Sequence, residues 1–190
     1  MKFHYAGKFN GDENSLPQRE HEPGYVPFKE PSDMQKFAKI MTVANLVVYV
    51  IFWGIGYFIK GHDLFTGIGF WLGFLCLVPH EFLHAICFKE DVYMYTNLKQ
   101  GMLFVVGQEN MSKTKFCLMS LLPNIIFGFI PFIIYMINPT LEILGELGAF
   151  SIAAGVGDYL NVFNALTQMP KGAKTYLSGM HSYWYLPEKN

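Results

Sequence analysis

The chain has 190 residues, of which 52% are hydrophobic and 17% aromatic, and its formal net charge is −1. Such an apolar composition excludes an ordinary soluble domain and favours a membrane protein. The near-neutral charge, without a cluster of lysine and arginine, excludes nucleic acid as a partner. The three cysteines all lie in apolar stretches and are odd in number, which favours reduced thiols over a disulfide framework.

A polar stretch precedes the first apolar run. Residues 1 to about 31 carry several glycines and prolines and nearly balanced charges, which predicts an extended, partly disordered leader. Twenty uncharged residues follow over 40–59. A helix of that length crosses the roughly 30 Å of hydrocarbon in a bilayer, so we expect the first membrane helix there.

Three later apolar runs predict three more membrane helices, over residues 64–88, 116–137 and about 141–168. Two β-prone runs between the second and third of the four, 92–95 and 102–106, predict a small β-hairpin. The expected fold class is therefore an all-α polytopic membrane protein with four transmembrane helices and this hairpin.

The distribution of lysine and arginine predicts the orientation in the membrane. With four crossings, thirteen of the 14 basic residues fall on one side and one on the other. The positive-inside rule then places both termini in the cytoplasm of a multi-pass cell-membrane protein. The expected domains are a polar cytoplasmic leader (1–36), a four-helix transmembrane domain (37–170) and a cytoplasmic or interfacial tail (171–190).

The second apolar run contains an H-E-x-x-H motif. On a helix, His80 and His84 would lie one turn apart on one face, where both can bind one zinc ion with Glu81 beside it as general base. Each ionisable group costs about 2–3 kcal/mol to insert into a membrane, so three within five residues indicate a function. The predicted chemistry is zinc-assisted hydrolysis of a peptide bond, in which Glu81 takes a proton from water and returns it to the leaving amine.

A catalytic zinc site generally needs a third protein ligand. Asp158 is the strongest candidate, because a carboxylate in an apolar segment requires a cation and because its expected depth matches that of the motif. Glu146, about 18 Å from Asp158 along the helix, is the main rival, and His181 and Asp91 are weaker ones. Asn161, one turn beyond Asp158, could orient a ligand or a substrate carbonyl, or form a plain interhelical hydrogen bond.

These residues resemble a known group. The run His80-Glu81-Phe82-Leu83-His84-Ala85 in one membrane helix, Gly157-Asp158-Tyr159 in a later one and a hairpin between them are similar to the zincin peptidases, small bacterial membrane proteins that resemble site-2-protease-type intramembrane metalloproteases. The resemblance covers roughly residues 64–185. It implies Zn²⁺ on His80, His84 and Asp158, with Glu81 as catalytic base. Site-2 proteases usually carry Leu-Asp-Gly at the third ligand, where this chain has Gly157-Asp158-Tyr159.

The predicted function is an intramembrane zinc metalloprotease. Its expected partners are the lipid bilayer and a membrane-embedded or membrane-associated protein substrate. The alternative is a non-catalytic zinc-binding or transport-type membrane protein. Replacing Glu81 by Gln separates the two, because only the protease loses cleavage while it retains zinc.

Overall fold

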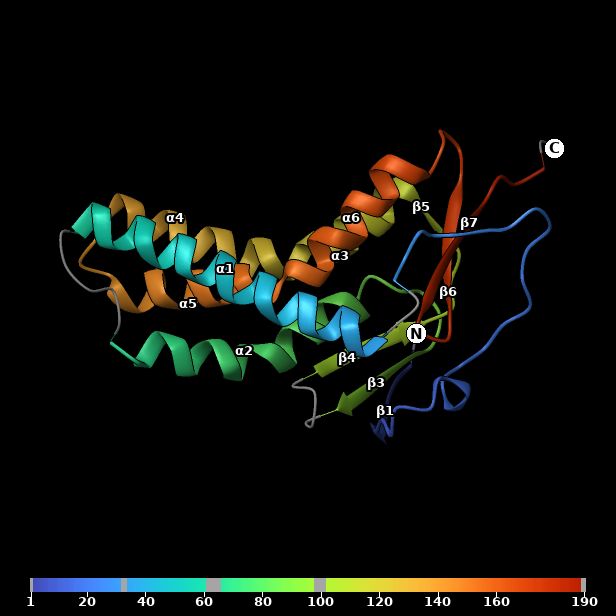
Figure 1. Cartoon of the computed structure of the whole chain (residues 1–190), viewed down its shortest axis with the longest axis horizontal. Coiled ribbons are helices and arrows are strands. Elements are labelled where there is room, and N and C mark those ends of the chain that lie inside the picture. The colour runs from blue at the N-terminus through green and yellow to red at the C-terminus, as the bar shows by residue number, and fades with distance from the viewer. Residues whose placement is uncertain (1, 32–33, 61–65, 98–101, 189–190) are drawn as a thin grey trace. The chain divides into compact units, whose positions relative to one another are not determined.

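The structure is a computed structural model that describes residues 2–31, 34–60, 66–97 and 102–188 (Figure 1). It is about 56% helix and 18% strand, and its described residues include seven strands in two β-sheets. The expected all-α fold class is therefore wrong. Most of the strands pair with partners far along the chain, so no local sequence pattern marks them as a sheet.

Contacts divide the chain into two compact units. The sheet unit comprises Met1–Glu30, Glu81–Ser120 and Asn161–Asn190, and the helical unit comprises Pro31–His80 and Leu121–Leu160. The polar residues near the two ends of the sequence thus belong to one unit with the stretch that follows the H-E-x-x-H motif.

The first sheet contains the expected hairpin and one further strand. Strands β3 (Val92–Asn97) and β4 (Met102–Gly107) are antiparallel, which confirms the hairpin, although its connection lies outside the described residues. Strand β1 (Phe3–Lys8) is parallel to β3, in the order β1-β3-β4. Residues 3–8 of the leader, expected to be extended, form this strand because β3 supplies the hydrogen-bond partners that they lack locally.

The second sheet has the strand order β2-β7-β6-β5. Strands β6 (Lys174–Ser178) and β7 (His181–Tyr185) form an antiparallel hairpin, whose turn places Gly179 at a φ of 63°, a conformation that favours glycine. Short strands complete the edges, with β2 (Val26–Pro27) on β7 and β5 (Met111–Ser112) on β6. A single turn of 3₁₀ helix, Glu13–Ser15, lies between β1 and β2.

A hydrophobic core in the sheet unit fixes the chain around the end of the motif helix. Helix α2 (Ile68–Ala85) contributes its last residue to this core, α3 (Lys113–Pro123) contributes Phe116 and Met119, and α6 (Val156–Gln168) contributes Ala165. Burial of such side chains contributes about 1.5–3 kcal/mol each. The buried members are Phe28, Ala85, Phe88, Val92, Met111, Phe116, Met119, Ala165, Met169 and Ala173.

Two of the expected membrane helices are interrupted. The run expected as one helix over 116–137 consists of α3, a π-helical segment Asn124–Phe129 and α4 (Ile130–Ile137). The change of helix type follows Pro123, which has no N–H to continue the α-helical pattern. The run expected over 141–168 is split into α5 (Glu142–Ala154) and α6, which are bent by 50°.

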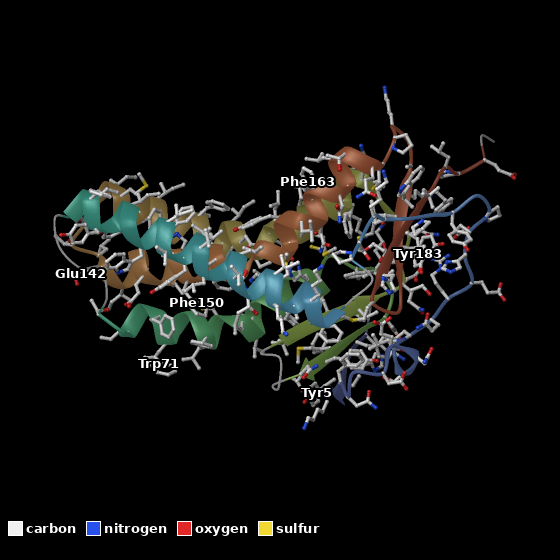
Figure 2. The ribbon with its side chains drawn as sticks, viewed as in Figure 1. Tyr5, Trp71, Glu142, Phe150, Phe163 and Tyr183 are labelled. Atoms are coloured by element: carbon white, nitrogen blue, oxygen red, sulfur yellow. The ribbon has the colours of Figure 1, made fainter. Side chains whose placement is uncertain are left out.

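The helices are apolar enough to span a membrane. Three stretches meet the length and composition required, Ala38–Ile59 within α1 (Met34–Lys60), α2, and Lys113–Ile137, and the bent pair α5–α6 would be a fourth. Only 6% of the α1 window is buried within the protein. On α2, Trp71 points away from the neighbouring helices (Figure 2) and is 66% exposed. Exposed apolar side chains in such number are typical of a surface that contacts lipid or another protein.

The helical unit depends on a close approach at Gly69, near the start of α2. A Cβ at this position would lie 2.7 Å from Cβ of Glu146 and would also meet the backbone of α5. We expect Gly69→Ala to destabilise the protein by about 1–3 kcal/mol. Gly54→Ala is the matched control, because a Cβ there meets nothing within 4 Å, and we expect it to stabilise α1 by about 0.5–1 kcal/mol. Thermal unfolding of both variants in one detergent checks the prediction, and equal midpoints would contradict it.

In the sheet unit, Glu109 ties the loop after β4 to the chain that leaves α2. Its carboxylate is 8% exposed, accepts hydrogen bonds from the backbone N–H groups of Lys89 and Glu90, and pairs with Lys115. Burial alone would raise the pKa of Glu109, but Lys115 and the two N–H groups outweigh it and lower the pKa below 4.5.

A carboxyl group with a lowered folded-state pKa stabilises the protein above its unfolded-state pKa and loses this effect as the pH falls through the folded-state value. We therefore expect Glu109→Gln to lower the unfolding temperature at pH 7, and the difference from the native protein to shrink below pH 4.5. Glu20→Gln, an exposed position, is the control. Unfolding scans over pH measure the effect, and a difference that persists unchanged at acid pH would refute this account.

Candidate metal centre

Helix α2 carries the H-E-x-x-H motif in its last turns. The potential ligand atoms of His80, Glu81 and His84 all lie within 4.8 Å of one another, as the helical spacing of 3.6 residues per turn leads one to expect. The two histidines are 7% and 6% exposed, and Glu81 is partly exposed. The sequence motif thus forms a compact cluster of nitrogen and oxygen donors on one helix.

His84 has the hydrogen bond that a metal-binding histidine requires. Its Nδ1 lies 2.9 Å from the backbone carbonyl oxygen of Met119. Since a carbonyl only accepts, Nδ1 carries the proton and Nε2 carries the lone pair that a metal ion needs. The carbonyl is available because Pro123, four residues further along α3, has no N–H with which to bond it.

His80 meets Asp158, the third ligand expected from the sequence. The His80 Nε2 and Asp158 Oδ2 atoms are 3.2 Å apart, and the two side chains are 8% and 15% exposed. Two donors that bind one tetrahedral zinc ion at about 2.0–2.1 Å lie roughly 3.3 Å from each other. The observed separation therefore fits two ligands of one zinc ion, and the imidazole and carboxylate donors are types that zinc binds.

Asn124 is a polar neighbour of Asp158 that the sequence analysis missed. It is fully buried and its Nδ2 donates a hydrogen bond to Asp158 Oδ2 at 2.7 Å. The hydroxyl of Tyr159 donates to the carbonyl of Ile152 at 3.0 Å and lies 3.4 Å from Asn124 Oδ1. The available sequence signal was an asparagine directly after a proline in an apolar run, since such polar residues in membrane segments make interhelical hydrogen bonds.

The structure places the rival ligands elsewhere. Glu146 is 1% exposed and accepts hydrogen bonds from Thr66 Oγ1 (2.7 Å) and the N–H groups of Gly67 and Gly69 (both 3.0 Å), so it caps the N-terminal end of α2. That end is opposite to the one that bears the motif.

The weaker rivals have partners within the sheet unit. Asp91 accepts a hydrogen bond from the N–H of Lys2 and contacts His4, and His181 lies 3.3 Å from both Glu13 and Glu30. Asn161 lies one turn beyond Asp158 on α6 and is half-buried, so its expected role beside the metal stays a prediction.

An apolar crevice lies beside His80 in the helical unit. It is too narrow to hold a water molecule, and its walls include Gly73, Phe127 and Phe150. Figure 2 shows Phe150 pointing from α5 toward α2, where its ring covers Gly73. Ser151 also lines the crevice, is 5% exposed, and its Oγ has no hydrogen-bond partner among the described residues. A dry, apolar wall therefore flanks one of the histidines.

Comparison with known proteins identifies the family. No curated protein and no solved structure gives a significant match to the chain. The sequence profile of a protein family described as "putative zincin peptidase" matches residues 73–174, more than half of the chain. The matched region contains the motif on α2, the hairpin β3–β4, Asn124 and Asp158. The chain therefore belongs to the putative zincin peptidase family, in which zinc and peptidase chemistry are the expected properties.

Proposed function

We propose that the protein is an intramembrane zinc metallopeptidase of the site-2-protease type. The observation that carries this proposal is the 3.2 Å contact between His80 and Asp158, 78 residues apart in the sequence and both in apolar helices. Charged and imidazole groups are costly in membrane segments and persist there where they serve a function. The contact supplies the H-E-x-x-H motif with the third donor that a catalytic zinc site needs.

In this proposal His80, His84 and Asp158 hold the metal, which leaves one coordination position open. A zinc ion bound there would lower the pKa of a water molecule and polarise the substrate carbonyl. Glu81 lies on the same turn of α2 as the histidines and is partly exposed, so its carboxylate can take the proton of the attacking water. Glu81 then returns this proton to the leaving amine, which completes peptide-bond hydrolysis.

We infer that the substrate is a membrane-embedded or membrane-associated protein. Three features support this assignment: the apolar spans that carry the ligands, the dry crevice beside His80, and the strong asymmetry of basic residues along the chain. By the positive-inside rule, both termini and the loop that contains β3 and β4 are cytoplasmic. The site would then lie within the cytoplasmic half of the bilayer.

The metal assignment predicts a specific pattern of zinc content. Detergent-purified native protein and Glu81→Gln should each contain about one zinc ion per chain, whereas His84→Ala and Asp158→Ala should lose it. Asp91→Ala and His181→Ala are matched controls that should retain zinc, because both residues have partners elsewhere. Elemental analysis after chelator-free purification makes the measurement. A native protein without zinc would refute the metallopeptidase assignment.

The role of Glu81 predicts a selective loss of hydrolysis. Without a carboxylate to accept the proton, Glu81→Gln should reduce cleavage by at least about 100-fold while zinc remains bound. The assay reconstitutes the protein in vesicles with a membrane-protein extract and identifies new peptide termini by mass spectrometry. Glu20→Gln, at an exposed position, is the control and should cleave as the native protein does. Cleavage that survives in Glu81→Gln would favour a non-catalytic or transport role instead.

A further inference from the structure

Two adjacent residues, the last of α3 and the first of the π-helical segment, influence two different ligands of the proposed metal centre. Pro123 ends α3 and Asn124 begins the π-helical segment. Because Pro123 has no N–H to bond the Met119 carbonyl, this oxygen can accept a hydrogen bond from His84. The side-chain amide of Asn124 donates a hydrogen bond to Asp158. π-Helical turns inside α-helices are frequent at functional sites. The position of this one, directly after a proline, suggests a purpose for the break in the helix.

The first contact depends on the missing N–H of Pro123. In an α-helix the N–H of residue 123 would bond the carbonyl of Met119, and proline removes that bond. The Met119 carbonyl instead lies 2.9 Å from Nδ1 of His84. A partner for the second ring nitrogen fixes both the tautomer and the orientation of a metal-binding imidazole.

The second contact depends on Gly155, at the bend between α5 and α6. Gly155 has a φ of −80°, so its backbone conformation does not call for glycine. Glycine is required there for lack of space, because a Cβ at this position would overlap the amide oxygen of Asn124. The glycine thus leaves a socket for Asn124, from which Nδ2 donates to Asp158 Oδ2 at 2.7 Å.

The hydrogen bond from Asn124 selects one oxygen of the carboxylate. The same Oδ2 atom lies 3.2 Å from His80 Nε2, so it faces both the amide and the imidazole. A carboxylate oxygen has two lone pairs, so a hydrogen bond from Asn124 is compatible with a metal ion bound to the same oxygen on the side of His80. Asn124 therefore holds Asp158 in an orientation that keeps Oδ2 beside the motif.

We propose that Pro123 and Asn124 are a pair of positioning residues that orient His84 and Asp158 for metal binding, with Gly155 as the socket for Asn124. This inference rests on the proposed zinc site and adds to it the residues that preorganise the ligands. Neither residue of the pair touches the substrate or the metal in this account. Their effect is on the affinity and the coordination geometry of the metal.

Titration of metal-free, detergent-purified full-length protein with Co²⁺ tests the proposal, because the visible absorption of Co²⁺ reports coordination geometry as well as affinity. Asn124→Ala and Gly155→Ala should each weaken Co²⁺ binding by about 10–100-fold and alter the spectrum. Gly157→Ala is the matched control, since this glycine lies two residues away and a Cβ there meets nothing within 4 Å. It should leave both affinity and spectrum unchanged.

A double-mutant cycle separates positioning from a general loss of packing. If Gly155→Ala acts by displacing the Asn124 side chain, the double variant Asn124→Ala/Gly155→Ala should bind Co²⁺ no more weakly than Asn124→Ala alone. Additive losses would overturn the assignment of Gly155 as the socket. Unfolding of the metal-free variants is measured in parallel. If Asn124→Ala does not fold, the difference in Co²⁺ affinity between Gly155→Ala and Gly157→Ala still tests whether the space at Gly155 is needed for metal binding.

Pro123→Ala tests the other half of the pair. It restores an N–H that competes for the Met119 carbonyl, so Co²⁺ binding should weaken while the metal-free helix becomes no less stable. Pro131→Ala, a buried proline of the same span, is its control. Affinity equal to that of Pro131→Ala would overturn the role of Pro123.

The outcomes distinguish this inference from the proposed function. A native protein that binds neither Co²⁺ nor Zn²⁺ refutes the metallopeptidase assignment, and the positioning role with it. Binding that Asp158→Ala abolishes but Asn124→Ala leaves intact refutes the positioning role alone.

Discussion

A carboxylate within apolar helices must share its charge with hydrogen-bond donors or a cation, because hydrocarbon cannot solvate it. The Oδ2 atom of Asp158 meets part of this requirement, because it faces the amide of Asn124 and the imidazole of His80. The bend between α5 and α6, the glycine at that bend and the π-helical segment all lie around this one atom. The irregularities of the helical unit are thus concentrated where a buried charge must be accommodated, while α1 is an uninterrupted helix.

Buried carboxylates also hold both ends of the motif helix. Glu146 accepts two backbone N–H groups where α2 begins, and Glu109 accepts those of Lys89 and Glu90 shortly after α2 ends. Each carboxylate accepts backbone N–H groups that have no partner within a helix. The start of α2 is thus anchored within the helical unit, and the chain that leaves α2 is anchored within the sheet unit.

The features that could be predicted from the sequence are those that local spacing and composition determine. The 3.6-residue helical repeat determines the cluster of His80, Glu81 and His84, and runs of uncharged residues determine the spans. Asp158 could be anticipated because a lone acid in an apolar run is conspicuous. The β3–β4 hairpin could be anticipated too, but the assembly of the two sheets could not, since β1 pairs with β3 and β2 with β7 at long separations in the sequence, and such pairing leaves no local periodicity. Asn124 was missed because a single asparagine in a membrane helix has several common structural roles.

The parallel pairing of β1 with β3 has a consequence for biosynthesis. Phe3 lies opposite Val92, so β1 must wait for about 90 residues of further synthesis, including α1 and α2, before its partner exists. At the usual 5–20 residues per second, this delay is on the order of 5–20 s. Strand β2 waits longer still, because Val26 pairs with Trp184. During that interval the backbone groups of β1 and β2 lack their strand partners. The second sheet can therefore close only after almost the whole chain has been synthesised, so every helix exists before the sheet unit is complete.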